Sequence, residues 1–118
     1  IVVASFHDFE ATPGDEQLAE VLAAMNYAGA DVLKFACMAN SATDAARVLA
    51  AQAWAREAYD RPVIGIAMGP NGAPTRLVGS ALGSAATFAT LPGWEGSAPG
   101  QFTVDQVRTV LDVVEGTN

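Results

Sequence analysis

The 118-residue sequence has little of several residue types, and each shortage narrows what the protein can be. Cys37 is the single cysteine, so no intrachain disulfide can form and no zinc-site spacing of cysteines is present. This fits a reducing compartment, and we expect the cytoplasm. No apolar run approaches the roughly 20 residues of a membrane span. We therefore expect no contact with a membrane, and we do not interpret the stretch IVVASFHDF as a signal peptide, because it lacks the charged region and the cleavage site of one.

Positive charge is also scarce. Six lysine and arginine residues stand against thirteen acidic ones, which gives a formal net charge of −7. No basic cluster is present, so we expect no binding to nucleic acid or to an anionic membrane surface. Half of the chain is apolar, a composition typical of a globular protein with a packed core.

Predicted strands and helices alternate along the chain. We expect strands at residues 1–6, 31–38, 63–68 and 85–89, and helices at about 15–28, 42–59, from 75, and at 104–115. Thr12 is predicted to cap the first helix, Ser41 to open the second, and Thr103 with Gln106 to form a capping box before the last. Alternation of this kind indicates a parallel sheet with right-handed crossovers. Two architectures fit: a small doubly wound sheet, or part of a (β/α)₈ barrel, which needs about 250 residues when complete.

One residue is out of place in a strand that is otherwise apolar. The stretch ADVLKFACM (30–38) carries Lys34, the only lysine of the chain, on the same face as Val32 and Ala36, while the odd-numbered residues face the covering helices. An amine buried without a partner tends to lose its proton, and a neutral amine can form a Schiff base with a carbonyl. The alternative is a lysine that reaches the strand end or pairs with a buried carboxylate.

His7, the only histidine, lies at the carboxyl end of the first predicted strand. That end of parallel strands carries the active sites of α/β folds, and imidazole is suited to general acid–base catalysis. A histidine alone is more often structural, but beside Lys34 on the same face we interpret it as catalytic. We interpret the adjacent Asp8 as a loop or cap residue.

Further candidates lie in the loops. Arg76 follows the loop GPNGAP and opens a predicted helix, which favours an anion, although a surface arginine fits equally well. The loop SAPGQ (97–101) is either a lid that hydrogen-bonds a polar ligand or an ordinary exposed connection. Met68 ends the third predicted strand and lines either the site or the core. Together these residues predict carbonyl chemistry through an imine, for which neither a metal nor a cofactor is required.

A series of motifs follows the order of a known family: SFHDF (5–9), VLKFACM (32–38), AMG…TR (67–76), GSAATFAT (83–90) and SAPGQ (97–101). Taken together they resemble type I 3-dehydroquinate dehydratase over nearly all of the chain. The resemblance implies that residues 1–118 are a single α/β unit of about four βα repeats, the C-terminal half of a (β/α)₈ TIM barrel. The sequence departs from the family at Ala39, where a proline is usual.

The resemblance also implies a reaction. Lys34 would form a Schiff base with the C3 ketone of 3-dehydroquinate, and His7 would remove the C2 proton and then help the C1 hydroxyl to leave as water. This hydro-lyase reaction is a syn elimination that yields 3-dehydroshikimate, on the shikimate pathway of aromatic amino-acid biosynthesis. Arg76 would bind the substrate carboxylate. Other substrate contacts are implied for Ser97, Gln101, Met68, Phe9 and Phe88.

Two other functions remain open from the residues alone. The chain could be another Schiff-base lyase, such as a class I aldolase, or a half-barrel that folds or binds ligand without turnover. In the resembling family the first half of the barrel holds the ring hydroxyls of the substrate and supplies a carboxylate that orients the histidine. Because an open half-barrel exposes apolar strand edges, we expect either a fragment of a longer protein or two copies that pair as a homodimer.

Overall fold

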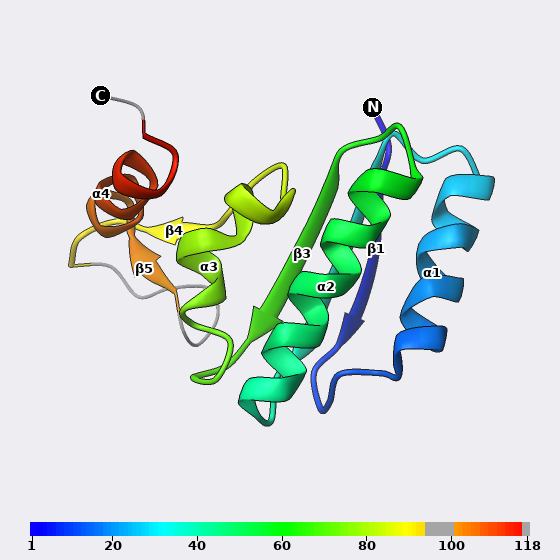
Figure 1. Cartoon of the computed structure of the whole chain (residues 1–118), viewed down its shortest axis with the longest axis horizontal. Coiled ribbons are helices and arrows are strands. Elements are labelled where there is room, and N and C mark those ends of the chain that lie inside the picture. Colours follow the sequence, from blue (N-terminus) through cyan, green and yellow to red (C-terminus); the bar gives the residue numbers. More distant parts are fainter. Residues whose placement is uncertain (94–100, 117–118) are drawn as a thin grey trace.

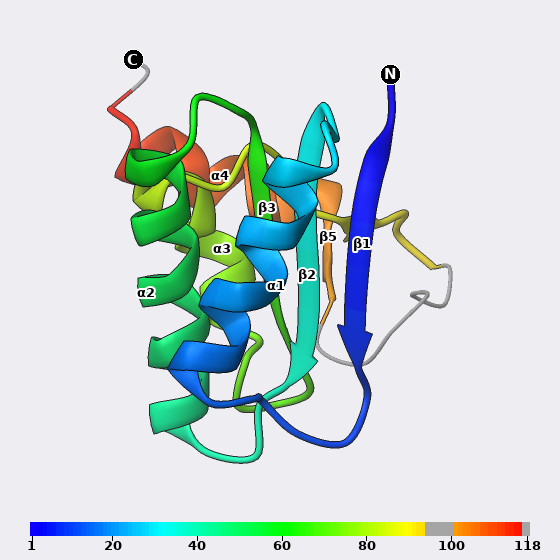
Figure 2. The same ribbon diagram turned by 90° about the vertical axis from the view of Figure 1, so that its right-hand side faces the viewer.

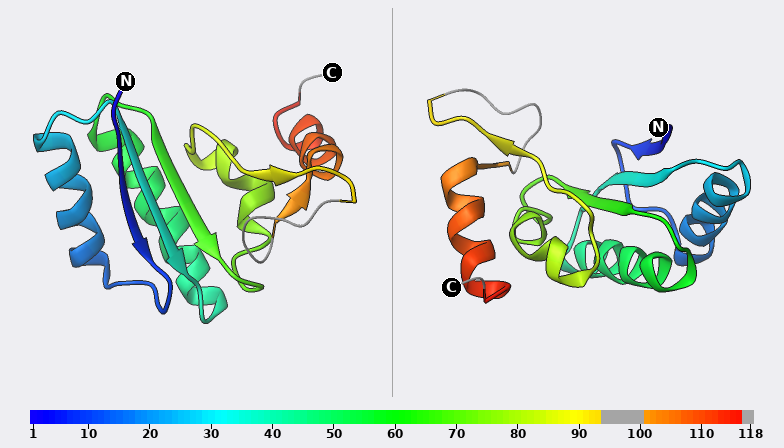
Figure 3. Two further views of the ribbon diagram at one scale, coloured as in Figure 1. Left: turned by 180° about the vertical axis from the view of Figure 1, so that it is seen from behind. Right: turned by 90° about the horizontal axis from the view of Figure 1, so that it is seen from above.

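A computed structural model of the chain describes residues 1–93 and 101–116. Its main sheet has three parallel strands that are neighbours in chain order: β1 (Val3–Asp8), β2 (Val32–Met38) and β3 (Val63–Met68). Two helices, α1 (Asp15–Tyr27) and α2 (Ala42–Ala58), both cover one face of this sheet (Figures 1 and 2). No described helix lies over the opposite face, which Figure 3 shows from behind. A doubly wound sheet would carry helices on both faces, so this arrangement is that of a barrel wall.

The second part of the chain packs beside β3. It consists of α3 (Thr75–Val78), the 3₁₀ helix η1 (Gly79–Leu82), β4 (Ala89–Thr90), β5 (Phe102–Thr103) and α4 (Val104–Val114). The short strands β4 and β5 pair in parallel with each other. Within the described residues, the only β-bridge from this part to β3 joins Ser84 to Val63.

The fourth strand is shorter and later than the sequence indicates. Residues 85–89 are expected to be extended, but the structure forms β4 only at Ala89–Thr90. The hydroxyl of Ser84 donates to the carbonyl of Ala86 at 2.9 Å, and such local side-chain bonds compete with a strand ladder. The first strand also differs, since it spans Val3–Asp8 in place of residues 1–6. The two-residue strand β5 is not predicted at all, because it is too short to show a periodicity.

The predicted caps of α2 and α4 are confirmed. The Ser41 hydroxyl accepts a hydrogen bond from the Asp44 backbone N–H at 3.1 Å. Thr103 and Gln106 form both bonds of a capping box at the start of α4. These motifs are readable from sequence because both partners lie within one helical turn.

The predicted cap of α1 is wrong. Gly14 is the N-cap residue of α1, and no side chain caps the helix. The hydroxyl of Thr12 donates instead to the carbonyl of Met38, at 2.9 Å. The Thr12 side chain therefore bonds to the end of β2, although the local sequence pattern predicts that it caps α1.

The core lies between the sheet and the two helices. Three residues of β2 are fully buried in this core, as the alternation of the strand predicts: Leu33, Phe35 and Cys37. On β1, Ala4 and Phe6 pack against this core, whereas Val3, Ser5 and His7 are exposed on the other face. No helix among the described residues is long and apolar enough to cross a membrane.

Candidate active site

Lys34 and His7 lie on the same face of neighbouring strands. The register of β1 with β2 places Ser5 opposite Lys34 and His7 opposite Ala36. Side chains two residues apart on a strand share a face. His7 is therefore on the same face as Lys34, two residues nearer the carboxyl end of the sheet. This is the helix-free face, which in a barrel would point to the interior.

A cavity of about 210 Å³ opens beside these two residues. It is lined by His7, Phe9, Lys34, Ala36, Ile66, Met68, Arg76, Phe88 and Gln101. Every site residue expected from the sequence lines this cavity except Ser97, which lies outside the described residues, as does most of the loop SAPGQ. Two lining residues were missed, Ala36 and Ile66, which pair in register on β2 and β3. Their position on the same strand faces as Lys34 and Met68 is the signal that would have found them.

Lys34 is half-buried, less enclosed than the sequence indicates, because its face of the sheet is not covered by a helix. Its Nζ atom lies 4.9 Å from the centroid of the Phe88 ring. The face of an aromatic ring attracts a cation, so Phe88 offers a contact to this amine when it is protonated. The amine is thus directed across the cavity toward the part of the chain that precedes β4.

The imidazole of His7 stacks on the ring of Phe9. The two ring centroids are 5.6 Å apart and the planes differ by 9°. Between them, Asp8 points away from the cavity and closes a turn, since its Oδ1 atom accepts hydrogen bonds from the N–H groups of Glu10 and Ala11, each at 3.0 Å. Asp8 is the last residue of β1 and caps the turn that follows, so of the two interpretations, loop or cap residue, the structure agrees with the cap.

Arg76 is the buried cation of the site. It is 7% exposed, which excludes the alternative of a surface arginine, and its Nε atom has no hydrogen-bond partner among the described residues. Burial lowers the pKa of Arg76. Its helix, α3, has only four residues, so the expected contribution of a helix N-terminus to anion binding is absent. A buried guanidinium N–H without a partner is costly, and an anion in the cavity would offset that cost.

Met68 and Gln101 complete the described wall. Met68 is buried at the end of β3 and lines the cavity, and it is not among the residues that form the core between the sheet and the helices. Gln101 is half-buried just before β5. No group of three or more His, Cys, Asp or Glu side chains in the described ranges is placed to hold a metal ion.

Comparison with known proteins identifies the family. A family model described as type I 3-dehydroquinase matches residues 1–118. The chain belongs to the type I 3-dehydroquinase family. The resemblance drawn from the sequence motifs is therefore confirmed. Among similar curated proteins, the 3-dehydroquinate dehydratase of Aromatoleum aromaticum is 40% identical over 114 residues, which are 97% of this chain and 43% of that protein.

The 3-dehydroquinate dehydratase of Shigella flexneri serotype 5b is 43% identical over 114 residues, 96% of this chain and 44% of the relative. This type I 3-dehydroquinase chain thus spans less than half the length of the curated relatives that it matches.

Solved structures of the family have the same fold. The 3-dehydroquinate dehydratase of Geobacillus kaustophilus superposes with a TM-score of 0.90 at 43% identity, over 97% of this chain and 44% of that one. The type I enzyme of Clostridium difficile gives 0.87 at 35% identity, over 99% and 46%. The expected fold class, α/β of the (β/α)₈ TIM-barrel type with this chain covering about half a barrel, is confirmed.

Proposed function

We propose that this chain carries the catalytic groups of a 3-dehydroquinate dehydratase, a hydro-lyase that converts 3-dehydroquinate to 3-dehydroshikimate. The observation that carries the proposal is that the only lysine and the only histidine of the chain line one cavity with a buried arginine. The similar proteins named 3-dehydroquinate dehydratase support it. The reaction belongs to the shikimate pathway of aromatic amino-acid biosynthesis, and we expect it in the cytoplasm.

Lys34 begins the proposed reaction as a nucleophile. Its neutral amine adds to the C3 ketone of the substrate, and water leaves as the imine forms. The protonated imine draws electrons from the adjacent C2–H bond, so that His7 can remove this proton as a general base. The C1 hydroxyl then leaves as water with the proton returned by His7, a syn elimination overall. Hydrolysis of the imine releases 3-dehydroshikimate and restores the amine, so the net change is the loss of one water.

The other cavity residues bind the substrate in this proposal. Arg76 pairs with the substrate carboxylate, which supplies an acceptor for the buried Nε–H that has none among the described residues. Apolar contacts come from Phe9, Met68 and Phe88, and polar contacts from Ser97 and Gln101. The Clostridium difficile structure is described as containing covalently modified comenic acid.

A barrel of this type needs more strands than the described residues contain. Within them, β1 pairs only with β2 and leaves its other edge unpaired. We propose that residues 1–118 are the C-terminal half of the barrel, and that this edge pairs either with an N-terminal half or with a second copy in a homodimer. Small-angle scattering is the test, and a stable, compact monomer of 118 residues would contradict both arrangements.

The chemical proposal is tested by trapping the imine. The protein is incubated with 3-dehydroquinate and borohydride, and its intact mass is measured. Because Lys34 is the only lysine, a reduced adduct that disappears in Lys34→Ala locates the imine without further mapping. His7→Ala should still form the adduct but should lose turnover. An adduct without turnover in the wild type would favour a binding-only half-barrel, and an adduct with phosphorylated keto sugars alone would favour an aldolase.

A further inference from the structure

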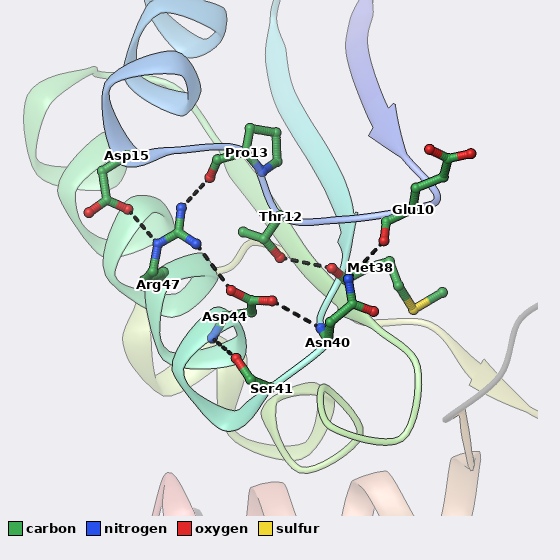
Figure 4. Close-up of polar contacts among 9 residues, drawn as sticks. All are labelled: Glu10, Thr12, Pro13, Asp15, Met38, Asn40, Ser41, Asp44 and Arg47. Carbon is green, nitrogen blue, oxygen red and sulfur yellow. Dashed lines mark hydrogen bonds and ion pairs between the residues drawn. The ribbon is translucent and has the colours of Figure 1, made fainter.

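The loop between β1 and α1 (residues 9–14) is fastened to the region where β2 passes into α2 (Figure 4). The side-chain amide of Asn40 donates to the carbonyl of Glu10 at 2.8 Å. Further along the loop, the Thr12 hydroxyl donates to the Met38 carbonyl and Arg47 donates to the carbonyl of Pro13. The strand that carries His7 is thereby joined, just beyond its carboxyl end, to the strand that carries Lys34.

Asn40 is itself held in place by the first turn of α2. Its backbone N–H donates to Oδ2 of Asp44 at 3.0 Å. The backbone N–H of Asp44 in turn donates to the Ser41 hydroxyl, and its other carboxylate oxygen lies 3.1 Å from Nη1 of Arg47. The Asn40 amide therefore projects from a fixed base, and a fixed donor can define the position of the chain that it binds.

Of the three bonds to this loop, the one from Asn40 is made at the residue nearest to His7 along the chain. Glu10, whose carbonyl accepts it, directly follows Phe9, and the Phe9 ring stacks on the imidazole of His7. Phe9 is 69% exposed, so burial does little to hold its ring in place. The imidazole makes no hydrogen bond to any described residue, and the ring of Phe9 is the aromatic contact that the structure gives it.

From this arrangement we infer that Asn40 is a positioning residue. Its amide fixes the Glu10 carbonyl, which holds Phe9 against His7 and so sets the plane of the imidazole in the cavity. The catalytic consequence rests on the proposed function, because it matters only if His7 transfers a proton. A base turned out of line with the proton that it takes is slower, while a substrate bound by other residues is retained.

The placement of the rings can be measured without any turnover. His7 is the only histidine of the chain, so its Cε1 proton gives a single imidazole resonance, which the stacked Phe9 ring shifts. Phe9→Ala gives the position of this resonance without stacking. We expect Asn40→Ala to move the resonance toward that position and Asn40→Gln, which keeps an amide donor, to restore most of the shift. Thr12→Val is the matched control, because it removes another hydrogen bond of the same loop farther from His7.

Kinetics on 3-dehydroquinate test the consequence. Asn40→Ala should lower kcat by about tenfold with little change in KM, since a misplacement of about 1 Å can cost up to about 100-fold. Thr12→Val should leave kcat unchanged. The inference is overturned if Asn40→Ala leaves the His7 resonance where it is, or if Thr12→Val moves it as far. Should the wild type form no borohydride-trapped adduct, the proposed function fails, while the resonances still decide whether Asn40 positions His7.

Discussion

The side-chain amide of Gln52 donates to the backbone carbonyl of Gly79 at 2.9 Å, and this bond ties α2 to the segment that follows Arg76. Gln52 is fully buried, and its Oε1 atom has no hydrogen-bond partner in the part of the chain that the structure describes. A buried polar side chain that is only half satisfied is a modest net contributor, because its bond is offset by the desolvated oxygen. Its value lies in fixing η1 behind the arginine of the site.

Substitutions at Gln52 should separate the stabilisation by its hydrogen bond from the cost of its unpaired oxygen. We expect Gln52→Ala to lower the free energy of unfolding by about 2–4 kcal/mol, through the lost bond and the cavity left behind. Gln52→Met fills the same space and removes the unsatisfied oxygen, so it should cost no more than about 1 kcal/mol. Urea denaturation of both variants is the measurement. Equal losses of stability in the two variants would show that the volume of the side chain makes no contribution.

Gly72 lies in the loop that leads from β3 to Arg76, and it leaves no room for a side chain. A Cβ atom there would lie 2.1 Å from the backbone oxygen of Ala67, so the loop must move to accept one. We expect Gly72→Ala to destabilise the protein by more than about 2 kcal/mol. The displaced loop carries Arg76 with it, so KM for 3-dehydroquinate should also rise. Unchanged denaturation and kinetics would show that the loop adjusts freely.

The uncapped start of α1 can be improved. Gly14 is the N-cap residue with φ −60° and ψ 155°, and a Cβ built on it meets nothing within 4 Å. Gly14→Ser would place a hydroxyl three residues before Gln17, which is the pattern of a capping box. Stability should rise by about 0.5–1 kcal/mol, from the cap and from a less flexible unfolded chain. Gly14→Ala is the control, since it lacks the acceptor and should give no comparable gain in thermal denaturation.

The Cys37 thiol should resist reagents in the native protein. Burial, with a smaller contribution from the negative charge of Asp8 and an opposing one from Arg47, raises the pKa of Cys37 to about 12. The thiolate is the reactive form, so we expect no reaction with Ellman's reagent at pH 8 until denaturant is added. Rapid labelling without denaturant would show that this face of β2 opens to solvent.

The same thiol makes stability depend on alkaline pH. Its pKa is raised from 9.0 in the unfolded reference to about 12 in the fold, so the unfolded state loses the proton first. The stabilising contribution is complete below pH 9 and is lost as the pH rises toward 12, by up to about 1.4 kcal/mol per pH unit. Cys37→Ala should lack this component of the slope. Parallel stability curves for the two proteins between pH 9 and 11 would contradict the assignment.

The main sheet could be predicted because its signals are local. The alternation along β2 is visible in the sequence, and it correctly assigns Lys34 to one face and Phe35 to the other. The carboxyl ends of parallel strands meet at one edge, which is why the sequence predicts that His7 shares a site with Lys34, while it leaves Met68 open between the site and the core.

The features that were missed depend on contacts between distant parts of the chain. Thr12 fits a helix cap, but it bonds the end of β2, 26 residues away. The bond from Asn40 spans 30 residues and leaves no pattern in the sequence. The late start of β4 is a different case, since the Ser84 hydroxyl bonds the Ala86 carbonyl only two residues away, and such local bonds compete with a strand ladder. The sequence offers no rule for choosing between such competing partners.

The two faces of β2 also bear on how this protein can diverge. Leu33, Phe35 and Cys37 meet the helices, while Lys34 and Ala36 meet the cavity. Successive residues of one strand are therefore exposed to different selection, one for a stable fold and the next for chemistry. Substitutions at the even-numbered positions could change which ligand the cavity binds, while the odd-numbered positions preserve the core. A new specificity could therefore arise without a loss of stability.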